Sequence, residues 1–276
     1  MKKIRLILSI ILGLFIISGC SNDSKIKTTT SSSKEEFADK AFLEDFKQGL
    51  YDRWDYQNGK ESDKDYETNL KTYYKKLADK ELDSIKKYKN AKFKDSQLHE
   101  YALSYINNLE KSKTLSKEDY IAFEFSDGDV VDNMSIAYGK VYSKRIMLIR
   151  NIVNKYDVKT DKKHKESLSE LLDNAKLADK KQQEIESVNN IFKNVTFTKN
   201  PNDDTEYTAV VENNTNFTFN NILCSYRLLL SDNTVVNTSY ISIQKWAPHQ
   251  KYTISMYSND TFDKTELLNC DYEIER

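Results

Sequence analysis

Residue types that commonly build catalytic and metal sites are scarce in this chain. Its 276 residues include only three histidines, three cysteines and six glycines. His99, His164 and His249 lie far apart and form neither an HxxxH pair nor a Cys–His pair, which argues against a zinc site. The glycine-rich signatures of phosphate, dinucleotide and nucleophile-elbow sites do not occur either. We therefore expect a protein that is not an enzyme and that has no metal site and no cofactor.

An excess of positive charge is also missing. The chain has 42 lysine and arginine residues against 43 aspartate and glutamate residues, which gives a net charge of −1 at pH 7. A nucleic-acid-binding domain would carry a concentrated basic footprint, and no segment of this sequence does. We expect no nucleic-acid partner.

The long apolar run of the chain is confined to its N-terminus. Lys2, Lys3 and Arg5 precede an uncharged stretch over residues 6–17. This arrangement is typical of a secretory signal, and the stretch is too short to span a membrane comfortably. The sequence predicts a signal peptide over residues 1–19.

The signal ends in Ile17-Ser18-Gly19-Cys20, which resembles the lipobox of bacterial lipoproteins. The resemblance implies cleavage between Gly19 and Cys20 and transfer of a diacylglyceryl group to the cysteine sulfur. Two acyl chains, at roughly 0.8 kcal/mol per buried methylene, would give stable anchoring. We therefore expect a lipid anchor at Cys20, on the outer face of the cytoplasmic membrane of a Gram-positive bacterium. The alternative is an ordinary cleaved signal in which Cys20 is incidental.

Three further segments differ in composition. In residues 20–36 the segment that follows the cysteine is polar. It cannot bury enough apolar surface to become ordered, so we expect a flexible tether here. Residues 37–192 lack proline and repeat apolar residues at helical spacing, which predicts an all-α helical bundle. Residues 193–276 alternate β-branched and aromatic residues with polar ones, which predicts an all-β domain. The expected fold class is α+β, built as two domains.

Five helices are predicted in the first domain. Asp95 is the candidate N-cap of the third helix, and Asp127 or Asp129 that of the fourth. The acidic cluster Asp127-Gly128-Asp129 with Asp132 is alternatively a calcium site, although it lacks the spacing of an EF-hand loop. The expected helices cover about 42–54, 66–85, 96–109, 130–156 and 165–191.

Short strands separated by asparagine-rich turns predict a β-sandwich in the second domain. The alternation places one set of residues on one strand face: Ile222, Cys224, Tyr226, Leu228 and Leu230. Other strands are expected at 207–212, 234–243, 252–257 and 268–274.

The segments VENNTNFTFNNILCSYRLLLSDNTVV and WAPHQKYTISM resemble the FxLYD-type and related Ig-like modules that end many Firmicute lipoproteins. That family usually has Pro-Gly-Glu where this chain has Pro248-His249-Gln250. The segment FLEDFKQGLYDRW, at the start of the first domain, is similar to helical modules of uncharacterised Gram-positive lipoproteins. These resemblances imply an Ig-like sandwich at the C-terminus and carry no activity.

Cys224 and Cys270 remain after Cys20 is assigned to the lipid. Cys224 shares its strand face with Ile222 and Tyr226, and Cys270 shares its face with Leu268 and Tyr272, so both should point into the sandwich core. A disulfide between them is expected, and the alternative is two buried free thiols.

Two groups of aromatic residues are candidate binding surfaces. Tyr51, Arg53, Trp54 and Tyr56 cluster at the end of the first helix, where aromatic rings beside a cation could stack on sugars or peptides. The alternative is that these residues belong to the core. Core packing is also expected for a possible platform at the sandwich edge formed by Trp246, Tyr252 and Tyr257.

These observations together predict an extracellular, membrane-anchored lipoprotein that acts as a binding, adhesion or envelope-interaction module. Its partner would be an envelope protein, a peptide or a wall polymer, in addition to the membrane that holds the lipid. The alternatives are a solute- or peptide-binding receptor, disfavoured because no βαβ alternation is visible, and an enzyme that acts on the cell wall, disfavoured by the missing catalytic constellations.

Overall fold

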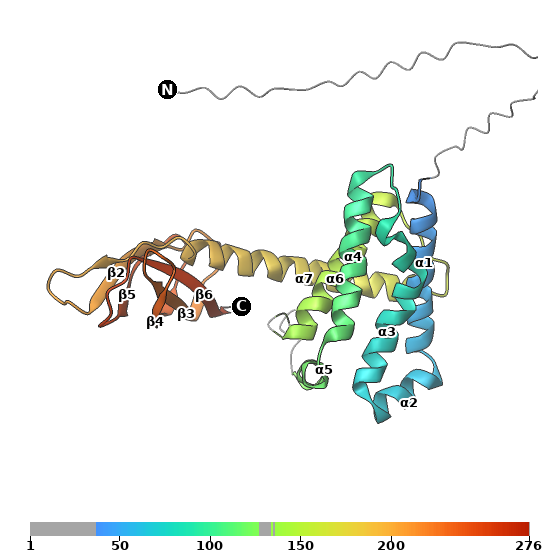
Figure 1. Ribbon diagram of the computed structural model, residues 1–276, viewed down its shortest axis with the longest axis horizontal. Coiled ribbons are helices and arrows are strands. Elements are labelled where there is room, and N and C mark those ends of the chain that lie inside the picture. Colours follow the sequence, from blue (N-terminus) through green and yellow to red (C-terminus); the bar gives the residue numbers. More distant parts are fainter. Residues whose placement is uncertain (1–36, 127–133, 135, 276) are drawn as a thin grey trace, which may run out of the picture. The chain divides into compact units, whose positions relative to one another are not determined.

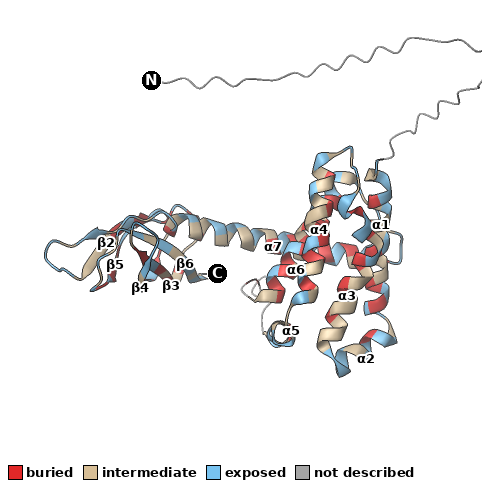
Figure 2. Ribbon diagram, in the orientation of Figure 1, coloured by how far each residue is buried: buried red, intermediate tan, exposed pale blue. Residues whose placement is uncertain are grey.

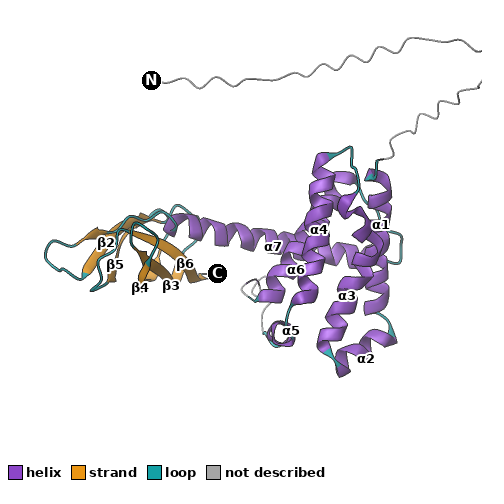
Figure 3. Ribbon diagram, in the orientation of Figure 1, coloured by secondary structure: helices purple, strands orange, loops and turns teal. Residues whose placement is uncertain are grey.

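The described part of the chain combines a helical region with two small β-sheets (Figures 1 and 3). The computed structural model describes residues 37–126, 134 and 136–275. The predicted lipobox with Gly19 and Cys20, the predicted tether, and the acidic cluster at Asp127, Asp129 and Asp132 lie outside these residues. The described residues confirm the mixed α+β class. None of the described helices has the length and apolar character needed to cross a membrane.

The helical region contains more helices than the periodicity predicts. Asn69 accepts a hydrogen bond from the Thr72 amide and starts a new helix there, which divides the predicted second helix in two. A short additional helix begins at a capping box formed by Ser116 and Asp119. Within the described residues the helices are α1 Asp39–Gln57, α2 Lys60–Thr68, α3 Leu70–Ile85, the 3-10 helix η1 Lys86–Asn90, α4 Ser96–Thr114, α5 Lys117–Glu124, α6 Ala137–Tyr156 and α7 Lys165–Phe192.

The predicted cap of the third helix is confirmed. The Asp95 carboxylate accepts hydrogen bonds from the Gln97 and Leu98 amides at 2.9 and 3.0 Å, which satisfies two free donors at the start of α4. Behind this cap most of the buried apolar side chains of the helices share one large core. Its largest fully buried side chains include Phe42, Phe46, Leu50, Leu98 and Tyr105. Figure 2 shows the buried residues of both regions in red.

The C-terminal region forms two antiparallel sheets of three strands each, in the orders β1-β2-β5 and β4-β3-β6. The inner faces of both sheets contribute to a second core. The strands are β1 Thr198–Lys199, β2 Glu206–Glu212, β3 Phe219–Leu229, β4 Val235–Trp246, β5 Lys251–Tyr257 and β6 Lys264–Ile274.

The predicted alternation along β3 is confirmed as far as Leu228, because alternate side chains from Ile222 to Leu228 are fully buried while Leu223 is exposed. The alternation ends there: Leu229, beside a register shift in the β3–β4 pairing, is also buried, and Leu230 lies beyond the end of β3 and is half-buried. The prediction for Leu268 is wrong. A register shift in the β3–β6 pairing turns Leu268 outward, and Leu267 packs against the core in its place.

The two remaining cysteines form a disulfide. Cys224 on β3 lies directly opposite Cys270 on β6, with their Cα atoms 4.1 Å apart. The bond therefore joins neighbouring strands of one sheet, and Cys224 is fully buried while Cys270 packs against the same core. This crosslink ties the C-terminal strand to the centre of its sheet.

Helix α7 contributes to both cores. Its first half packs in the helical core through Leu168, Leu171 and Ala175. Its last turns place Val188 and Phe192 in the core of the sheets, and the Tyr226 hydroxyl donates a 3.0 Å hydrogen bond to the Phe192 carbonyl. The division between residues 192 and 193 stays a prediction, but the sheet core uses side chains that precede it.

Candidate functional site

The predicted aromatic cluster on α1 does not form an exposed surface. Successive residues of an α-helix are about 100° apart around the axis, so Tyr51, Arg53, Trp54 and Tyr56 point in several directions. Arg53, Trp54 and Tyr56 are buried, and Tyr51 is half-buried. Three of the four therefore follow the core alternative, and the structure brings only Arg53 and Trp54 to a common pocket.

A buried charge cluster lies beneath that pocket. Arg53 Nη1 donates a 2.9 Å hydrogen bond to Glu81 Oε1, and Arg145 Nε donates to both carboxylate oxygens of Glu81, at 2.9 and 3.0 Å. Arg145 Nη2 lies 2.7 Å from Glu81 Oε1. The Tyr105 hydroxyl donates a further hydrogen bond to Glu81. One carboxylate is thus shared by two arginines, and at most 4% of each of the three charged residues is exposed.

A close approach of α1 to α3 makes this cluster possible. Gly49 lies one turn before Arg53, and a Cβ atom at Gly49 would stand only 3.0 Å from the Glu81 carbonyl oxygen. The missing side chain lets α1 approach the backbone of α3, and Arg53 then reaches Glu81 across the same contact. Arg53 Nη1 also donates to the Leu77 carbonyl at 3.3 Å.

The charges of the cluster support one another. Burial alone would raise the pKa of Glu81, but the positive charges of Arg145 and Arg53 outweigh burial and hold that pKa below its ordinary value. Burial raises the pKa of Tyr138 to about 12, although Arg53 and Arg145 oppose the change. Because its own pKa is lowered, Glu81 is ionised in the folded protein at neutral pH. Two guanidinium groups and one carboxylate leave a formal charge of +1 beneath the pocket.

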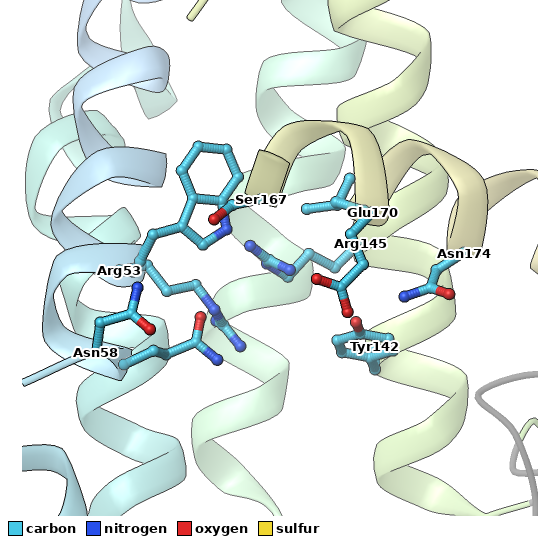
Figure 4. A pocket seen from close by; sticks show the side chains of 10 residues that line it. Arg53, Asn58, Tyr142, Arg145, Ser167, Glu170 and Asn174 are labelled. Atoms are coloured by element: carbon cyan, nitrogen blue, oxygen red, sulfur yellow. The ribbon is translucent and has the colours of Figure 1, made fainter. Parts of the chain in front are cut away.

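The pocket lies where α1, α6 and α7 meet and has a volume of about 210 Å³. Figure 4 shows the arginines entering it from opposite sides: Arg53 from α1 and Arg145 from α6. Helix α7 crosses above them. The full lining comprises Arg53, Trp54, Gln57, Asn58, Tyr142, Arg145, Ser167, Glu170, Leu171 and Asn174.

Apart from its charged groups, the lining is mostly neutral and polar. Gln57, Asn58 and Asn174 supply amides that can donate and accept hydrogen bonds, and Ser167 and Tyr142 supply hydroxyl groups. Glu170 is exposed and forms no ion pair within the part of the chain that the structure describes. Such a lining can bind and orient a small polar molecule.

His164 forms a neighbouring cluster that the sequence did not indicate. Its ring stacks on Tyr51 with the ring centroids 4.0 Å apart. Nε2 lies 3.0 Å from an Asp55 oxygen, and Nδ1 lies 2.9 Å from an Asp161 oxygen. The buried ring therefore joins α1 to the start of α7 and positions the helix that covers the pocket.

Other surface hollows are lined by charge of mainly one sign. One of about 240 Å³ is lined by Asn107, Asn108, Lys111, Lys140, Val141 and Lys144. Another, of about 450 Å³, is mainly acidic and is lined by Asp52, Asp55, Tyr56, Gly59, Glu61, Lys80 and Asp83. No group of metal-ligating side chains that could hold an ion occurs among the residues that the structure describes.

The possible platform on the sheets does not assemble, and the core packing expected in its place is confirmed for Trp246 but is wrong for Tyr252 and Tyr257. Trp246 is fully buried, and its Nε1 donates a 2.9 Å hydrogen bond to the Gln250 carbonyl. Tyr252 and Tyr257 are exposed, but they stand an odd number of residues apart on β5 and so face opposite sides of the sheet.

The comparisons with known proteins add no relative. No family model, no curated protein and no solved structure matches this chain.

Proposed function

We propose that this protein is an extracellular, lipid-anchored binding protein without catalytic activity. Cys20 would carry the lipid after cleavage behind Gly19, the polar segment would lift residues 37–276 from the membrane, and the helical region would hold the ligand. The single observation that carries the binding role is the pocket at Arg53 and Arg145. The two arginines are buried, and they line an open polar pocket. Buried charges of this kind are not required for a stable helical core, which favours a role in binding.

The size of the pocket favours a small solute over a polymer as its occupant. About 210 Å³ holds a molecule of roughly the size of a metabolite and not a folded partner. Among the expected alternatives, this supports a solute- or peptide-binding receptor more than an adhesion module. The positive charge beneath the pocket further favours a ligand that carries a carboxylate or another anionic group.

The C-terminal region would then be an Ig-like sandwich that serves as a spacer or as a contact with an envelope protein or a wall polymer. Two antiparallel sheets with one common core support this assignment. The resemblance of the segments at residues 211–236 and 246–256 to FxLYD-type modules supports it as well.

Ligand binding to the detergent-solubilised full chain tests the proposal. Calorimetric titration with small carboxylates and phosphates should detect binding, and Asn174→Leu should abolish it because the larger apolar side chain occupies the pocket. Asn190→Leu is the matched control, since Asn190 is exposed further along α7 and does not line the pocket. Equal binding by both variants would contradict the pocket assignment. The intact mass of the membrane-extracted protein tests the anchor: it should show a lipid on Cys20 as the first residue.

A further inference from the structure

The pocket contains charges of both signs that are separate from one another. The arginines lie at its floor, while Glu170 reaches in from α7. Figure 4 shows the Glu170 carboxylate directed into the same space as the Arg145 guanidinium. No ion pair joins Glu170 to either arginine in the described structure, whereas Arg53 and Arg145 both bind Glu81. A ligand can therefore meet each charge independently.

The two arginines retain positive charge after they bind Glu81. Three ionised groups with a formal sum of +1 are buried at the floor, and the two guanidinium groups together have more N–H donors than one carboxylate can accept. A carboxylate of a ligand is the natural acceptor for such donors because its planar geometry matches a guanidinium group. Glu170 favours a cationic group of the ligand instead, because an ionised carboxylate only accepts hydrogen bonds and attracts positive charge.

The uncharged residues of the lining limit the size and the chemical class of the ligand. Trp54 is only 6% exposed and lies close to Tyr51 and His164, so it offers the pocket little ring surface on which a sugar could stack. The amides of Gln57, Asn58 and Asn174 favour a compact polar molecule. The volume of about 210 Å³ admits one small molecule of this kind.

We propose that the pocket binds a small zwitterion of the α-amino acid class, with its carboxylate toward Arg53 and Arg145 and its ammonium group toward Glu170. This proposal rests on the binding function proposed above and names the ligand class of the same site. The ligand is bound without any covalent step.

Matched ligands test the proposal on the detergent-solubilised full chain. Free L- and D-amino acids are titrated calorimetrically, and the tightest of them is compared with its N-acetyl derivative and its amide. The first derivative lacks the ammonium charge and the second lacks the carboxylate. Each should bind at least about tenfold more weakly than the free amino acid, because one charged contact is lost in each case.

Two substitutions on α7 locate the ammonium contact. Glu170→Gln should weaken binding of the free amino acid about tenfold and leave binding of the N-acetyl derivative unchanged. Glu166→Gln removes an exposed carboxylate one turn earlier that does not line the pocket, and it should change neither affinity. Glu170 and Glu166 lie on the helix surface, so neither substitution disturbs the buried charge cluster.

The outcomes separate this proposal from the broader binding function. If the N-acetyl derivative binds as tightly as the free amino acid and Asn174→Leu abolishes both, the zwitterion proposal is overturned while the binding function stands. An unchanged amino-acid affinity in Glu170→Gln would also overturn it. If no amino acid, carboxylate or phosphate binds, both proposals fail.

Discussion

The helical region and the sheets have cores of different chemistry. Beneath its pocket the helical core buries Arg53, Glu81 and Arg145, and residues 37–192 contain no cysteine. Among the described residues of the C-terminal region (193–275), the buried polar side chains, in the strands and their connections, are all uncharged: Asn213, Thr215, Ser239 and Ser258. The sheet core is instead crosslinked by the disulfide between Cys224 and Cys270.

The difference shows how each region depends on its surroundings. A buried ion cluster holds its helices only while all its members remain charged, because a lost partner leaves an uncompensated charge in the core. A disulfide depends on an oxidising compartment and is insensitive to moderate changes of pH. We therefore expect acid and substitution at Glu81 to weaken mainly the helices, and reduction to weaken mainly the sheets.

The largest effect is expected for Glu81→Gln. The substitution removes the only negative charge between Arg53 and Arg145 in the buried cluster that the structure describes, so the two guanidinium groups would repel each other in the core. Breaking a buried ion pair in this way costs about 3–5 kcal/mol of unfolding free energy. Urea denaturation followed by far-UV circular dichroism, which reports mainly on the helices, measures the loss.

Glu110→Gln is the control for this substitution. Glu110 pairs with Lys89 on the surface at 2.7 Å, and an exposed pair contributes at most about 1 kcal/mol.

The lowered pKa of Glu81 adds a test by pH. Because the folded state binds this proton less readily than the unfolded state, the cluster stabilises the protein above the ordinary glutamate pKa, about 4.3, and loses this contribution as the pH falls through the lowered pKa. Equal acid sensitivity of the wild type and Glu81→Gln would contradict this account.

The next largest effect is expected from loss of the disulfide. The bond closes a loop with a sequence separation of 46 residues, and in the chain-entropy model its removal costs roughly 4 kcal/mol. The double variant Cys224→Ser, Cys270→Ser should therefore destabilise the sheets, as measured by urea denaturation followed through the fluorescence of Trp246 in a background that carries Trp54→Phe. Reductant should destabilise the wild type similarly and should leave the double variant unchanged. Two free thiols in the denatured, unreduced mature protein would refute the pairing.

Local sequence signals predicted most of the elements but could not reveal the pocket. The cap at Asp95 and the alternation from Ile222 to Leu228 depend on neighbours in the sequence, and both are confirmed. The split at Asn69 and the Ser116 capping box are local signals as well, because each capping residue marks the start of one extra helix in the sequence itself. These features follow from short-range chemistry.

The pocket depends on contacts between distant residues. Arg53 and Glu81 are 28 positions apart, and Glu81 and Arg145 are 64 apart. In the sequence each is one charged residue among many on a helix, for which a solvated position is the ordinary expectation. The prediction for Leu268 failed for a related reason, because a register shift between strands leaves no mark in the alternation of a single strand.

The smallest effect concerns the place where the two regions join, and Tyr226→Phe tests it. The substitution keeps the buried ring but removes the hydroxyl that donates to the Phe192 carbonyl at the end of α7. Loss of this buried hydrogen bond should cost about 1–2 kcal/mol, since the carbonyl is left without that donor. Tyr240→Phe is the matched control, because Tyr240 is 59% exposed and its substitution should change stability by less than about 0.5 kcal/mol.

If α7 belongs energetically to the sheets as well as to the helices, Tyr226→Phe should accelerate amide hydrogen exchange in both the last turn of α7 and the centre of β3. Faster exchange in β3 alone would place the boundary between the regions after Phe192 and remove the end of α7 from the folding unit of the sheets.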